Sequence, residues 1–103
     1  MIVKLNENNF ENNISVGIKL VEFYAPWCHF CQRQSDILKE LSENNIWIGK
    51  VNSDENDNLV NLYRITAFPS FILFKDGEIL TRFQGLKSKY EIMNILKDYV
   101  WFY

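Results

Sequence analysis

Cys28 and Cys31 are the only two thiols of the chain, and His29 and Phe30 separate them directly after the apolar segment 21–27. Positions i and i+3 of a helix lie on one face with Cβ atoms about 5–6 Å apart, so two thiols at this spacing can bond reversibly. At a helix start the first thiol also faces unpaired N–H groups and the positive end of the dipole, which favour a thiolate. We therefore expect Cys28 to attack a disulfide and Cys31, one turn further in, to resolve the mixed disulfide.

Three other uses of the two cysteines compete with redox chemistry. A structural disulfide across two intervening residues would remove little entropy from the unfolded chain. Zinc needs four ligands, whereas the chain offers two cysteines and a single histidine, His29. Because His29 lies between the two cysteines in the sequence, its side chain would point away from them. Reduced cysteines can simply fill space, although the start of a helix after a strand is an unusual place for that. We favour redox chemistry, which this spacing in a βα context indicates, and expect no metal and no cofactor.

Length and composition predict one small domain, residues 1–103. A chain of 103 residues that is 48% hydrophobic can close a single core. The net charge is -2 and the basic residues are scattered, so we expect no nucleic-acid binding. No apolar run reaches the roughly 18 residues that span a membrane, and the start MIVKLNENNF is too short and polar for a signal peptide. We expect a soluble, cytoplasmic monomer.

The hydrophobic pattern predicts alternating strands and helices, followed by a hairpin and a terminal helix. The predicted strands are Ile2–Leu5, Ile18–Tyr24, Ile46–Asn52, Phe71–Phe74 and Glu78–Phe83. The predicted helices are one around Phe10 and Ile14, one over Cys28–Glu43, one capped by Ser53 or Asp54 with an inner face of Leu59, Leu62 and Tyr63, and a last one after Ser88 with a stripe of Ile92, Ile95, Leu96 and Tyr99.

This order of elements predicts an α/β fold, a three-layer α/β/α sandwich with a mixed central sheet. Crossover helices imply parallel strands with helices on both faces of the sheet. Asp76 and Gly77 are a strong signal for the closing hairpin, and Ser88 with Glu91 forms a capping box for the last helix. Chemistry in such sheets gathers beyond the carboxyl ends of strands, often at a helix N-terminus. Cys28 is predicted to lie there.

Four segments of the chain, VEFYAPWC with the following x-x-C, KVNSDEN, FPSFILFKDGE and FQGLKSK, resemble the thioredoxin superfamily along nearly its whole length. The resemblance implies a thioredoxin fold and thiol–disulfide exchange with protein disulfides. Cys28 and Cys31 match the nucleophilic and resolving cysteines. Pro69 matches the cis-proline of the family, which would place it beside Cys28. The alternative for Pro69 is a trans turn proline that opens a strand.

Glu22 is the second residue of interest, because alternation along the strand sends it to the face opposite Val21 and Phe23, where a central strand has no solvent. The resemblance implies that Glu22 lies under the site near Lys50 and exchanges a proton with the resolving thiol. Burial raises and Lys50 lowers the pKa of such a carboxyl. The alternative is a solvated Glu22 on an edge strand.

A third set of residues is implied by the resemblance to contact the substrate. Apolar surface around a thiolate suits flexible polypeptide substrates, which bind by backbone pairing and loose hydrophobic contact. Phe30 either joins this surface or packs down against the helix. The residues that match substrate-contacting positions are Trp27, Ala67, Phe68, Gly85 and Leu86.

The departures from the family bear on the direction of the reaction. His29-Phe30 is neither the Gly-Pro of thioredoxins nor the Gly-His of disulfide isomerases, and Asp36 stands where most members have a helix-kinking proline. A protonated His29 would favour the Cys28 thiolate, whereas a solvated His29 would tune nothing. We expect a reductant that a flavoprotein thioredoxin reductase regenerates. A disulfide isomerase or oxidase, as VEFYAPWC also suggests, and a non-catalytic thioredoxin-like binding module are the alternatives.

Overall fold

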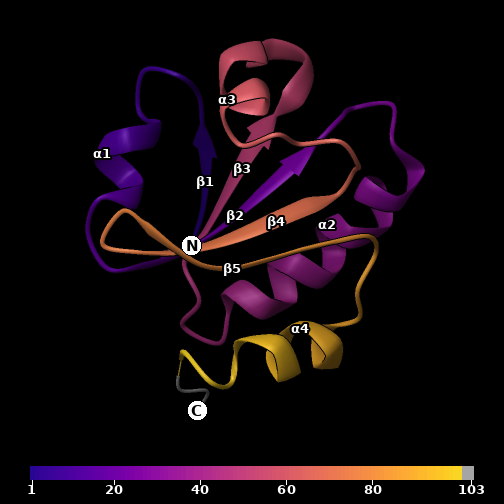
Figure 1. Ribbon diagram of the computed structural model, residues 1–103. Helices are drawn as coiled ribbons and strands as arrows, with labels where there is room; N and C mark the ends of the chain where they lie inside the picture. The colour runs from indigo at the N-terminus through magenta and orange to yellow at the C-terminus, as the bar shows by residue number, and fades with distance from the viewer. Residues whose placement is uncertain (101–103) are drawn as a thin grey trace.

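The computed structural model describes residues 1–100 and consists of a mixed five-stranded sheet with helices on both faces (Figure 1). The fold class expected from the sequence is confirmed. The strands are β1 (Ile2–Leu5), β2 (Ile18–Tyr24), β3 (Ile48–Asn52), β4 (Ser70–Lys75) and β5 (Glu78–Gln84). The helices are α1 (Phe10–Ile14), α2 (His29–Ser42), the 3-10 helix η1 (Ser53–Glu55), α3 (Asp57–Leu62) and α4 (Lys89–Leu96).

The strand order β1-β3-β2-β4-β5 places β2 at the centre of the sheet. β1, β3 and β2 run parallel, and β4 is antiparallel to both β2 and β5. Glu22 on β2 lies opposite Lys50 on β3 and Phe71 on β4. Because the parallel strands β2 and β3 end on the same side, the segment after β2 that begins α2 emerges at the carboxyl edge of the sheet.

Two hydrophobic layers hold the helices to the sheet. α1 and α3 cover one face, and α2 and α4 cover the other, as Figure 1 shows. The first layer is built on Phe10, Ile14, Leu59, Phe23 and Phe74, among others. The second is built on Leu38, Leu41, Ile92, Leu96 and Phe71, among others. Alternate side chains of β2 and β4 enter opposite layers, which is why both strands read as continuous apolar runs.

Two predicted local signals appear in the structure. Asp76 and Gly77 join β4 to β5 with positive φ at both residues (49° and 86°), the requirement of a two-residue type I′ turn. Ser88 caps α4 by accepting from the amide of Glu91, whose side chain accepts from the amide of Ser88 in return. The expected hairpin and capping box are therefore confirmed.

The start of α3 is where the sequence prediction is wrong. Ser53 and Asp54 form η1 instead of capping α3, and Asn56 is the residue before its first turn. Asn56 is buried, and its side chain accepts from the amide of Glu7 and donates to the carbonyl of Asn52. The hydrogen bond with Glu7 joins Asn56 to a segment 49 residues away in the chain, and α3 begins directly after Asn56, at Asp57.

Three smaller boundary predictions also differ from the structure. β3 begins at Ile48 rather than Ile46, so Ile46 packs in the core from the loop before the strand. Leu62, expected on the inner face of α3, is 68% exposed, because Leu59 and Tyr63 occupy that face. α4 ends at Leu96, and Tyr99 lies beyond it and is exposed.

Candidate active site

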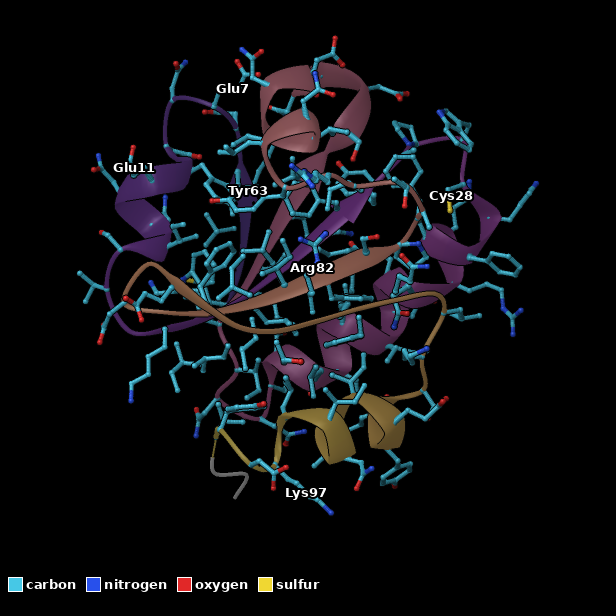
Figure 2. All side chains as sticks on the ribbon, viewed as in Figure 1. Glu7, Glu11, Cys28, Tyr63, Arg82 and Lys97 are labelled. Atoms are coloured by element: carbon cyan, nitrogen blue, oxygen red, sulfur yellow. The ribbon has the colours of Figure 1, made fainter. Side chains whose placement is uncertain are left out.

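Cys28 is the N-cap of α2 and points its sulfur at the first turn of the helix. Its backbone is extended (φ -86°, ψ 113°), and its Sγ accepts a hydrogen bond from the amide of Cys31 at 3.2 Å. The sulfur thus occupies the place of the oxygen of an N-cap serine or asparagine. Figure 2 shows Cys28 at the start of α2, toward the outside of the molecule.

The two cysteines are free thiols whose sulfur atoms lie 2.6 Å apart. A disulfide needs about 2.05 Å, so a small movement closes the bond and the helix can keep its place. Cys31 is 4% exposed, as expected of a shielded resolving thiol. Cys28 is 7% exposed and therefore more covered than its position at the helix start suggested, but its neighbours Trp27 and His29 are exposed.

Cys31 holds its proton tightly. Burial and the hydrogen bond with Cys28 raise the pKa of the Cys31 thiol to about 12. A thiol with this pKa is protonated at neutral pH, and only a thiolate attacks a disulfide. Any reaction through Cys31 therefore requires a nearby proton acceptor.

Glu22 is a fully buried carboxyl on the central strand β2. Its Oε1 lies 3.7 Å from Nζ of Lys50, and neither carboxyl oxygen has a hydrogen-bond partner among residues 1–100. Burial raises the pKa of Glu22 to about 7, against the opposing effect of the Lys50 ammonium. The alternative of a solvated Glu22 on an edge strand is wrong, because β2 is central.

Lys50 lies beside a cavity that reaches Cys31. The cavity has a volume of about 220 Å³, and its lining includes Cys31, Tyr24, Ser35 and Lys50. The Lys50 ammonium donates to Oγ of Ser35 at 3.4 Å and lies 4.9 Å from the centre of the Tyr24 ring. Sequence reasoning missed Ser35 and Tyr24. The position of Ser35, one helical turn after Cys31, is a signal that could have identified it.

Pro69 follows a cis peptide bond with Phe68, so the alternative of a trans turn proline is wrong. The Phe68 carbonyl oxygen lies 3.8 Å from Sγ of Cys28, which brings this segment against the dithiol. The Phe68 ring packs edge-on against the Trp27 indole at 5.7 Å between centroids. The indole Nε1 donates to Asp54 at 3.3 Å, a contact that sequence reasoning did not predict.

The predicted substrate-contacting residues come from three segments of the chain, of which the one with Phe68 reaches Cys28. Trp27 and Phe30 are 65% and 56% exposed, so the alternative that Phe30 packs down is wrong. Gly85 has a φ of 90°, and its amide donates to the Pro69 carbonyl at 2.8 Å. Ala67, Phe68 and Leu86 are partly exposed.

Two further expectations concern α2 and metal binding. α2 runs from His29 to Ser42 as one helix through the exposed Asp36. Over residues 1–100 no three His, Cys, Asp or Glu side chains lie close enough together to hold a metal ion. In the same part of the chain, no helix has the length and apolar character needed to cross a membrane.

A dithiol at a helix N-terminus, facing a cis-proline on this mixed sheet, defines a thioredoxin-fold thiol–disulfide oxidoreductase. The chain matches the family model described as Thioredoxin over residues 1–98, and it belongs to the thioredoxin family. It is 36% identical to a thioredoxin of Chlamydia pneumoniae, covering 96% of this chain and 99% of that one. It is 35% identical to a thioredoxin of Buchnera aphidicola, covering 94% of each. Thioredoxin Y1, chloroplastic, of Arabidopsis thaliana is 39% identical over 77% of this chain and 48% of its own length.

Proposed function

We propose that this protein, acting as a single domain and a monomer in the cytoplasm, reduces disulfides in protein substrates. A flavoprotein of the thioredoxin reductase class would return it to the dithiol form. The observation that carries the proposal is the pair of free thiols, 2.6 Å apart, at the N-terminus of α2. Similarity to bacterial thioredoxins over nearly the whole chain supports the reducing direction.

The reaction proceeds in two exchanges of sulfur. The Cys28 thiolate attacks one sulfur of a substrate disulfide, so a Cys28–substrate bond forms, the substrate bond breaks, and the first substrate thiolate leaves and takes up a proton. Cys31 then loses its proton and attacks Sγ of Cys28, which releases the second substrate thiolate. Two electrons pass from the dithiol to the substrate, and the protein is left as the Cys28–Cys31 disulfide.

Glu22 is proposed to accept the proton of Cys31. Its pKa of about 7 lies near working pH, which suits a group that must both take up and release a proton. The cavity lined by Lys50 and Cys31 is large enough to hold water next to the Cys31 thiol. Lys50 stabilises the ionised form of Glu22 before the transfer.

The polypeptide substrate is proposed to lie over Trp27, Phe30 and the loop segments at residues 67–69 and 85–86. These segments offer exposed aromatic side chains and partly exposed loop residues, a surface that suits an extended peptide. His29 is exposed at the first turn of α2 and would favour the Cys28 thiolate when protonated.

The catalytic assignment is tested by insulin reduction with dithiothreitol as the electron source. The wild-type protein should accelerate the reaction, and Cys28→Ser should abolish the acceleration because no nucleophile remains. Cys31→Ser should still attack but should accumulate a mixed disulfide, visible as a mass increase equal to one substrate chain. Full activity of Cys28→Ser would overturn the assignment, and an inert wild type would favour a non-catalytic binding module.

A disulfide isomerase or oxidase is the second candidate, because the segment VEFYAPWC also resembles disulfide isomerase domains and an exposed histidine, His29, follows Cys28. Equilibration with a mildly oxidising glutathione buffer, followed by thiol alkylation and mass measurement, separates the two. We expect mostly the Cys28–Cys31 disulfide, as for a strong reductant. A population that stays mostly dithiol would support the oxidase or isomerase instead.

A further inference from the structure

Gln34 is a fully buried polar residue of α2 that the two sulfur exchanges do not use. Its Nε2 donates to the carbonyl oxygen of Lys87 at 2.9 Å, and its Oε1 accepts from the amide of Lys87 at 2.9 Å. A buried amide group costs free energy unless both of its ends are hydrogen-bonded. Here a single residue of the β5–α4 connection satisfies both ends, so Gln34 joins two segments that are 53 residues apart.

The connection that Gln34 holds is the one that carries two proposed substrate contacts. Gly85 and Leu86 directly precede Lys87, and the connection passes α2 on its way from β5 to α4 (Figure 1). Gln34 lies three residues after Cys31, so the hydrogen bonds start from the same helix that presents the dithiol. The two hydrogen bonds between Gln34 and Lys87, which we call the clamp, therefore fix the position of this loop relative to the two cysteines.

Further contacts connect this loop to the segment of Pro69 and that segment to Cys28, so the contacts form a closed circuit. The Gly85 amide donates to the Pro69 carbonyl at 2.8 Å, and the Phe68 carbonyl oxygen lies 3.8 Å from Sγ of Cys28. The circuit starts at Gln34, continues through the β5–α4 connection and the cis-proline segment, and returns to the N-terminus of α2. Each proposed substrate-contacting loop is thus placed relative to Cys28 through backbone groups.

We propose that Gln34 is a positioning residue that holds the loop at residues 85–87 in register with Cys28 for polypeptide substrates. The proposal rests on the proposed function, since it assumes thiol exchange at Cys28. Burial alone does not explain the amide, because a leucine of similar volume would fill the same place. A leucine would, however, leave the amide and carbonyl of Lys87 without partners, and the loop would be free to move away from the helix.

The experiment compares two substrates of different size in single-turnover reactions of the pre-reduced protein. Insulin must contact the loop as well as Cys28, whereas a small aromatic disulfide such as dithiobis(nitrobenzoic acid) needs only the thiolate. Gln34→Leu should lower the second-order rate constant for insulin about tenfold, equivalent to about 1.4 kcal/mol, and that for the small disulfide less than about twofold. Gln34→Glu replaces the donor to the Lys87 carbonyl with a carboxylate oxygen that repels it, so it should also lower the rate constant for insulin more than that for the small disulfide.

Leu41→Ala is the matched control, because Leu41 is also a fully buried residue of α2 but packs in the second hydrophobic layer. It should destabilise the fold and leave both rate constants unchanged per folded molecule. Equal losses of Gln34→Leu on the two substrates, or no loss on insulin, would overturn the positioning role. A wild type that reduces neither substrate would instead defeat the proposed function.

Hydrogen exchange in the wild-type protein keeps the proposal testable if Gln34→Leu does not fold. The Lys87 amide donates to a buried acceptor and should exchange slowly, whereas an unbonded loop amide exchanges at the rate of an unstructured chain. Exchange of the Lys87 amide at the unstructured rate would show that the clamp is open in solution and would overturn the proposal.

Discussion

At the scale of single residues, the site depends on two groups whose proton affinity is changed by burial. Burial and Cys28 raise the pKa of Cys31 to about 12, and burial raises the pKa of Glu22 to about 7. The first shift keeps the Cys31 thiol, the proposed resolving group, protonated at neutral pH. The second keeps a carboxyl available that can accept a proton at neutral pH.

Glu22→Gln should slow the resolution of the mixed disulfide. The amide cannot accept the Cys31 proton, and loss of such a base commonly costs roughly a hundredfold in rate. The measurement is the lifetime of the Cys28–substrate disulfide after acid quenching and separation. Attack by Cys28 should be nearly unaffected and serves as the internal control. A resolution rate equal to that of the wild type would remove Glu22 from the mechanism.

Glu22 should also make the wild-type protein less stable as pH rises. Its pKa is about 7 in the folded protein and near the ordinary value of 4.5 in the unfolded chain, so the folded form binds more protons between these values. The free energy of unfolding should therefore fall from about pH 4.5 to about pH 7, by on the order of 3 kcal/mol from this group.

Urea unfolding of the wild type and Glu22→Gln over this pH range checks the prediction. The difference between the two proteins isolates Glu22, because the glutamine stays neutral and all other titrating groups are shared. The free energy of unfolding of the variant should depend less on pH. From pH 4 to pH 8, the stability of the variant should therefore rise relative to that of the wild type. Parallel curves would mean that Glu22 is solvated in the folded state.

At the scale of elements, the N-termini of α2 and α4 are capped by different groups. Cys28 uses its sulfur to accept from the first turn of α2, so the capping atom is also the proposed nucleophile. Ser88 and Glu91 cap α4 in the ordinary way, and the hydrogen bonds with Ser88 hold the pKa of Glu91 below its usual value. One helix start therefore serves chemistry, and the other holds the helix that packs beside α2.

Ser88→Ala should lower the free energy of unfolding by about 1 kcal/mol, because the amide of Glu91 loses its acceptor. Thermal or urea unfolding measures the change. Ser42→Ala is a suitable control, since its hydroxyl bonds only back to the Lys39 carbonyl in its own helix, and it should change stability by less than about 0.5 kcal/mol. Equal effects of the two variants would argue against the capping box.

At the scale of the whole molecule, β4 binds the two hydrophobic layers together. Phe71 enters the layer under α2 and α4, and Phe74 enters the layer under α1 and α3. Phe71 also stacks on Phe83 of β5, with 4.8 Å between centroids and 17° between the planes. The same strand begins one residue after Pro69, so the core and the active-site segment share one support.

Phe71→Ala should remove about 3–5 kcal/mol of stability, because it leaves a cavity in a fully buried layer and ends the stacking on Phe83. This is a large part of the 5–15 kcal/mol that is usual for a small domain. Urea unfolding followed by circular dichroism measures it, and an unchanged slope with denaturant would show that only stability has changed. A loss below about 1 kcal/mol would mean that the layer closes around the gap.

Local patterns predicted most of the elements and the centre of the site. β1 and β2 have the predicted bounds. The Asp76-Gly77 turn and the capping box of α4 could be predicted because neighbouring residues in the sequence determine their geometry. The spacing of Cys28 and Cys31 was informative for the same reason. The start of α3 was not, because the buried side chain of Asn56 takes its partners from the loop after β1, at Glu7, and from the end of β3, at Asn52.

The sequence by itself predicted which atoms would react, since two thiols one helical turn apart after a buried strand already indicate a dithiol couple. Tertiary structure alone decided how these atoms are tuned and approached. The pKa of Glu22 depends on its complete burial beside Lys50, and the Gln34 contacts join residues 53 apart in the chain. Electrostatic and hydrogen-bond energies depend on distance and burial in space, which a local pattern of residues does not contain.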